Sequence, residues 1–68
     1  MGKLARKLGK RLKKERGDMS QVQFARRIGV SKSSLNRMEI ADQNVTLRTL
    51  EHLCKVLKCD IGELFEPE

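Results

Sequence analysis

Four polar side chains share one face of the segment 31–39 if that segment is helical. They are Lys32, Ser33, Asn36 and Arg37. Leu35 and Met38 lie three residues apart and fall on another face, where they can be buried. Arginine and lysine donate hydrogen bonds to guanine, asparagine pairs with adenine through two hydrogen bonds, and serine adapts to either base. The polar face therefore has the chemistry to read base edges in the major groove of DNA.

The segment before it predicts another short helix and a tight turn. Ser20 can cap a helix over 20–28, and Gln23 completes a capping box. The apolar residues of that helix share one face: Phe24, Ala25 and Ile28. Gly29 is a helix exit, because glycine takes a left-handed conformation at little cost, and Ser31 can cap the helix over 31–39. This arrangement is typical of a helix-turn-helix, whose first helix crosses the phosphate backbone while the second enters the groove.

A helix must precede this unit to support it. Residues 3–16 predict one that ends near Gly17 and turns Leu4, Leu8 and Leu12 toward the core. Gly9 weakens that helix by about 1 kcal/mol relative to alanine.

Two further helices are predicted after the unit. Thr46 caps one over 46–57, which carries the longest apolar stripe in the chain and is expected to pack at the centre of the core. Asp60 with Glu63 begins a short last helix over 60–65. Apolar residues recur at three and four, never at two over a useful length, so we expect an all-α, compact five-helix bundle in one domain spanning 1–68.

Size and charge indicate the class of partner. The 68 residues carry a net charge of +6, and eight of the first 16 residues are basic. The end of the chain is acidic, with one basic residue and four acidic ones from 58 onward. A polyanion is therefore the expected ligand, with double-stranded DNA favoured over an anionic membrane surface. A chain this short buries only about 60% of its unfolded surface, which favours a homodimer.

Catalytic and metal-binding groups are scarce. There is one histidine, no tyrosine or tryptophan and no glycine-rich phosphate loop, so we expect no enzymatic activity and no cofactor. His52, Cys54 and Cys59 supply at most three metal ligands where structural zinc takes four, and we expect no metal. No apolar run is long enough for a membrane span and no leader pattern follows the basic start, so we expect the protein in the cytoplasm with both cysteines reduced.

The order of these pieces resembles the phage-repressor and Cro-type helix-turn-helix domains, also called the XRE type. The resemblance covers about four-fifths of the chain. It is carried by Ser20-Gln21, Phe24-Ala25, Ile28-Gly29-Val30-Ser31, Met38-Glu39, Thr46-Leu47, Thr49-Leu50 and Leu57 to Phe65.

The resemblance implies a lambda-repressor-like fold of five helices and a dimer on a two-fold-related site. It implies that Gln21 touches a phosphate and that the polar face of 31–39 reads bases or clamps the backbone next to them. It also implies that Glu39 pairs with a basic residue of the first helix, either Lys13 or Lys14. The candidate DNA contacts are Gln21, Ser31, Lys32, Ser33, Asn36, Arg37, Gln43 and Asn44.

Two departures from the family pattern affect these assignments. The family usually has a glycine two residues after the glutamate, where this chain has Ala41. Between Gly17 and Ser20 the chain has Asp18-Met19 where one residue is common, so the register of the first helix is ambiguous by one position. The choice between Lys13 and Lys14 therefore stays open.

The sequence thus predicts a DNA-binding transcriptional regulator, most simply a repressor or autoregulator, that binds a palindromic operator as a homodimer. Apolar residues near the C-terminus are the expected dimer face: Ile61, Leu64 and Phe65. One alternative keeps the fold and makes the protein an antitoxin that binds a toxin protein. Another, which the leucine face of 3–16 makes less economical, is a basic amphipathic helix that binds a membrane or an acidic partner.

Overall fold

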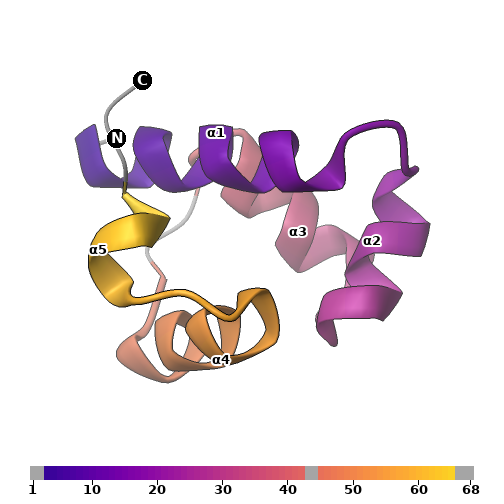
Figure 1. Cartoon of the computed structure of the whole chain (residues 1–68). Helices are drawn as coiled ribbons and strands as arrows, with labels where there is room; N and C mark the ends of the chain where they lie inside the picture. The colour runs from indigo at the N-terminus through magenta and orange to yellow at the C-terminus, as the bar shows by residue number, and fades with distance from the viewer. Residues whose placement is uncertain (1–2, 43–44, 66–68) are drawn as a thin grey trace.

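Five helices follow one another in the computed structural model, which describes residues 3–42 and 45–65 (Figure 1). They are α1 (Lys3–Arg16), α2 (Gln21–Ile28), α3 (Lys32–Glu39), α4 (Leu47–Leu57) and α5 (Ile61–Leu64). No strand occurs within those residues. The all-α class and the five-helix bundle predicted from the sequence are confirmed.

The helices begin where side chains satisfy free backbone N–H groups. The hydroxyl of Ser20 accepts from the N–H of Gln23, and the Gln23 side chain accepts from the N–H of Ser20, both at 3.1 Å. Ser31 and Thr46 accept in the same way from the N–H groups three residues on. Each cap holds a donor that has no partner inside the helix, so these polar residues fix the helix starts.

Three helices end in the same left-handed turn, with only one glycine among them. After α2 the residue is Gly29 (φ 75°), after α3 it is Ala41 (φ 58°), and after α4 it is Lys58 (φ 54°). The residue after each donates its N–H to the carbonyl five positions earlier, at 3.0, 2.8 and 3.0 Å respectively. This is the Schellman pattern. Ala41 thus takes the left-handed conformation at the position that the resembling family fills with glycine.

Replacing Lys58 with glycine should stabilise the fold. Lys58 is exposed and its φ of 54° is left-handed, which costs a residue with a Cβ about 1 kcal/mol. We expect the Lys58→Gly variant to gain about 0.5–1 kcal/mol in free energy of unfolding, measured by urea denaturation. The matched control is Lys55→Gly inside α4, which should lose about 1 kcal/mol. If Lys58→Gly lowered the free energy of unfolding as much as Lys55→Gly does, the left-handed conformation of Lys58 would not be costly.

The core forms where all five helices meet. Its buried side chains are Leu8, Leu12, Phe24, Ala25, Ile28, Leu35, Met38, Leu53 and Leu64. Two expectations about it are wrong. Leu4 is 61% exposed, because it lies before the part of α1 that packs on the core. In α4 only Leu53 is buried, and Leu47 is 77% exposed, so α4 covers one side of the core and does not form its centre.

The first helix lies across α3 and closes the bundle over it (Figure 1). The contact is closest at Gly9, where a Cβ would lie 2.6 Å from the carbonyl oxygen of Glu39 and 2.8 Å from that of Met38. Glycine at this position therefore lets α1 touch the backbone at the end of α3. Glycine lowers the stability of α1, but its lack of a Cβ allows the two helices to come this close.

Candidate nucleic-acid interface

The outer face of α3 has the polar character predicted from the sequence. Lys32, Ser33 and Arg37 are exposed and Asn36 is half-buried. On the other side of the helix Leu35 and Met38 are buried in the core. Burial of those two side chains orients α3 and leaves the polar residues at the surface.

A buried carboxylate anchors the C-terminal end of α3. The side chain of Glu39 is 2% exposed. Nε of Arg16 donates to one of its oxygens at 2.8 Å and Nη2 donates to the other at 3.0 Å. This two-point pairing is the strong form of an arginine–carboxylate contact, and it ties the last residue of α1 to the last residue of α3.

The expected partner of Glu39 is therefore corrected. Neither Lys13 nor Lys14 reaches it; both are exposed, and the cation is Arg16. Nη1 of Arg16 also donates to the carbonyl of Met19 at 3.1 Å, so the turn between α1 and α2 folds back over this side chain. The cation thus lies two positions after Lys14, outside the one-position ambiguity that the sequence left.

Gln21 joins the first two helices of the motif through its side chain. Its Nε2 donates to Oδ1 of Asn36 and to Oε1 of Glu39, each at 3.1 Å. An amide nitrogen has two hydrogens, and both are used here. A phosphate contact through this nitrogen requires one of the two bonds to be exchanged.

These contacts form one network, which we call the Arg16–Asn36 cluster: Arg16, Gln21, Asn36 and Glu39. Its members come from α1, α2 and α3, so it sets the positions of the two motif helices relative to the first helix. The oxygen of Asn36 accepts from Gln21, which leaves the amino group of Asn36 as a donor for another partner.

The chain also matches the model of a known family. The family model for the Cro/C1-type HTH DNA-binding domain matches residues 7–68. The chain belongs to this family. No curated protein and no solved structure matches it. Cro/C1-type domains are DNA-binding regulators, and the resemblance found in the sequence is thereby confirmed.

Three further candidate DNA contacts of this Cro/C1-type domain are Ser31, Gln43 and Asn44. Ser31 is exposed and its hydroxyl accepts from the N–H of Ser34, so it starts α3. Gln43 and Asn44 lie outside the described residues.

The predicted dimer residues do not all reach the surface of the Cro/C1-type domain. Leu64 is fully buried in the core, and this part of the expectation is corrected. α5 is one turn long and must turn Leu64 inward to close the bundle beside α1. Ile61 is 50% exposed and Phe65 is half-buried, so these two remain available to a second copy.

Sequence reasoning overlooked a cation beside the turn of the Cro/C1-type motif. Arg48 is exposed and lines a shallow hollow with Gly29, Val30, Thr49 and His52. Nε2 of His52 lies 2.6 Å from the carbonyl oxygen of Ile28 and donates to it, which ties α4 to the end of α2. The signal for Arg48 was present, since a basic residue two positions after the Thr46 cap must lie at the start of α4.

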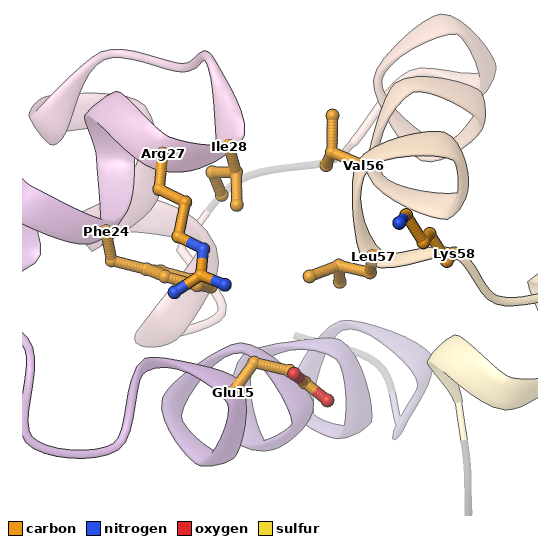
Figure 2. Close-up of a pocket in the computed structure, with 7 residues that line it drawn as sticks. All are labelled: Glu15, Phe24, Arg27, Ile28, Val56, Leu57 and Lys58. Carbon is orange, nitrogen blue, oxygen red and sulfur yellow. The ribbon is translucent and has the colours of Figure 1, made fainter.

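A larger pocket lies between the C-terminal half of α2 and the end of α4. Its volume is about 350 Å³. Figure 2 shows Phe24, Arg27 and Ile28 from α2 on one side, Val56, Leu57 and Lys58 at the end of α4 on the other, and Glu15 of α1 between them. The Glu15 carboxylate accepts from Nε of Arg11 at 3.0 Å. None of these residues comes from α3, so its polar face does not line the pocket.

Across residues 3–42 and 45–65, no group of three histidine, cysteine or acidic side chains is placed to hold a metal ion. Within the same ranges, none of the helices combines the length and apolar character needed to cross a bilayer.

Proposed function

We propose that this Cro/C1-type protein is a sequence-specific transcriptional repressor that binds a palindromic operator as a homodimer. The observation that carries the proposal is the placement of α3: its apolar side is buried, and its polar side, with Lys32, Ser33 and Arg37, is exposed on a basic domain. A helix presented in this way fits the width of the major groove.

The residues of α3 divide by the contacts they offer. Arg37 and Lys32 are exposed and long enough to donate to guanine O6 and N7. The oxygen of Asn36 accepts from Gln21, and its amino group can donate to a purine N7 acceptor. We assign specificity to these three side chains and place Ser33 beside them as an adaptable contact.

The phosphate contacts flank α3 on both sides. On α2, Gln21 exchanges one of its internal hydrogen bonds for a phosphate oxygen, or leaves that contact to the free backbone N–H groups at the helix start. Arg48, at the start of α4, supplies a cation on the other side. Contacts of this kind orient the protein without reading sequence.

Dimerisation is proposed through the surface around α5. Ile61 and Phe65 offer exposed apolar area there, and the surrounding acidic residues keep this end away from phosphates. Two copies related by a two-fold axis then present two α3 helices to successive major grooves, about 34 Å apart.

Selection of bound sequences from a random duplex pool tests the proposal most directly. We expect an enriched palindrome whose half-site centres are separated by one helical turn, and affinity that falls steeply as salt rises. A reporter promoter overlapped by the enriched site should be silenced. An unenriched pool, or binding that does not change with salt, would refute sequence-specific recognition by this face.

Arg37→Ala should weaken binding to the selected site by about 1.5 kcal/mol, roughly tenfold, because one base contact is lost. The preference at a single base position should relax at the same time. Binding is measured by titration of labelled duplexes with selected and scrambled sequences. Arg26→Ala is the matched control, since Arg26 is also exposed but lies near the end of α2. Equal losses of affinity in the two variants would mean that Arg37 contributes only general positive charge and reads no base.

A further inference from the structure

The two cysteines are brought together at the turn between α4 and α5. Cys59 donates its backbone N–H to the carbonyl of Cys54 at 3.0 Å, across the left-handed Lys58. In a Schellman turn the side chains at these two positions face each other and usually make an apolar contact. The sequence spacing of five hid this, because it matches no common two-cysteine motif.

The two cysteines are close to each other, and each keeps some accessible surface. Burial raises the pKa of the Cys59 thiol, the nearby Arg11 opposes this effect, and the neighbouring Cys54 adds to it. Both side chains are half-buried and both are free thiols. A disulfide needs Cβ atoms about 4 Å apart, and a Schellman turn brings the side chains at these two positions toward each other.

We propose that Cys54 and Cys59 are a site of reversible oxidation, which closes to an intramolecular disulfide in the presence of a small-molecule disulfide of the glutathione type. Two valines would make the same apolar contact, whereas only two thiols can be cross-linked. The two cysteines are not among the proposed DNA contacts, so a failure of this proposal would not affect the proposed function, and the reverse also holds.

The reaction is a pair of exchange steps. One cysteine thiolate attacks a sulfur of glutathione disulfide, forms a mixed disulfide and releases one glutathione thiolate. The second cysteine thiolate then attacks the cysteine sulfur of that mixed disulfide and releases the other glutathione. The protein loses two electrons and two protons, and one glutathione disulfide becomes two glutathione molecules.

Closure would join the end of α4 to the residue that precedes the Asp60 cap of α5. The helix α5 carries Leu64 into the core, and Arg11 of α1 donates to the carbonyl of Glu63 at 2.5 Å. A cross-link beside this contact therefore fixes the junction at which α5 closes the bundle. The left-handed Lys58 lies inside the ring that this bond would close.

The test titrates the reduced full-length chain with mixtures of glutathione and glutathione disulfide, followed by acid quenching and intact mass measurement. We expect a monomer lighter by two hydrogen atoms, in about tenfold excess over the glutathione adduct, because the second thiol has a high effective concentration. Dithiothreitol should restore the reduced mass.

Single variants provide the matched controls. Cys54→Ser and Cys59→Ser should each accumulate a stable glutathione adduct on the remaining thiol, and neither should lose two hydrogens. Circular dichroism of the oxidised wild type should keep the helical signal of the reduced protein. Persistent adducts on the wild-type chain, disulfide-linked dimers on a non-reducing gel, or no reaction at all would each overturn the proposal.

Discussion

Replacing Arg16 with alanine is expected to lower the free energy of unfolding by about 3 kcal/mol, the low end of the range for breaking a buried ion pair. The side chain of Glu39 is 2% exposed, so the carboxylate would be left in the interior with only the Gln21 amide as donor. The low end applies because the Arg16 side chain is itself 25% exposed. A domain of this size has roughly 3–10 kcal/mol in total, and urea denaturation would show a large fall in midpoint.

Replacing the carboxylate of the pair should lower the free energy of unfolding by less than replacing the arginine does. In Glu39→Gln the arginine loses its partner, but it lies close enough to the surface to be hydrated, and we expect about 1–2 kcal/mol. Arg16→Lys keeps the charge without the two-point geometry and should fall between the two. Arg26→Ala, which removes an exposed arginine, is the control and should change stability by less than about 0.5 kcal/mol. If Glu39→Gln lost more free energy of unfolding than Arg16→Ala, the buried carboxylate would not be the group that depends on the ion pair.

The helices themselves were predictable because their signals are local. Ser20, Ser31 and Thr46 each satisfy an N–H within three residues, and Gly29 turns the chain immediately after α2. These interactions depend on residues close in sequence, so a pattern of caps and apolar spacing is enough to place them. The polar face of α3 followed from the same periodicity, since burying Leu35 and Met38 fixes which side remains outside.

The contacts between helices could not be predicted from the sequence. The Arg16–Glu39 pair joins residues 23 positions apart, and its register depends on how the Asp18-Met19 turn folds. Leu4 and Leu64 carry equally apolar side chains at helical spacing, yet the first is 61% exposed and the second is fully buried. The spacing of apolar residues identifies the apolar face of a helix, but the neighbouring helices determine how much of that face is buried.

The polar cluster shows the same limit at the candidate site. Gln21 and Asn36 were both predicted to face DNA independently, whereas they are bonded to each other at 3.1 Å. A side-chain amide can donate, accept or do both, so its role depends on neighbours that the sequence does not identify. The hydrogen-bond partners thus change Gln21 from a simple phosphate contact into a residue that also positions Asn36.

Gly9→Ala should destabilise the fold by about 2 kcal/mol, although alanine is the better helix former. The substitution gains about 1 kcal/mol of helix propensity, but overpacking at a tight contact costs about 3 kcal/mol. The added methyl would lie 2.6 Å from the carbonyl oxygen of Glu39 and 2.8 Å from that of Met38. Thermal and urea denaturation measure the net effect. The matched control is Gly62→Ala in α5, where nothing lies within 4 Å of the added Cβ and no loss is expected.

The nature of the obstacle gives a second test. Both atoms that the methyl would meet belong to the backbone of α3, so α1 must move away from that helix to accept it. Shortening a nearby side chain cannot make room, and Met38→Ala should therefore add its own cavity cost of about 2–5 kcal/mol without rescuing Gly9→Ala. Moving α1 also moves Arg16 relative to Glu39, so the effects of Gly9→Ala and Arg16→Ala on stability should not be additive. Full additivity of Gly9→Ala with Arg16→Ala would show that the close approach at Gly9 and the ion pair hold α3 independently.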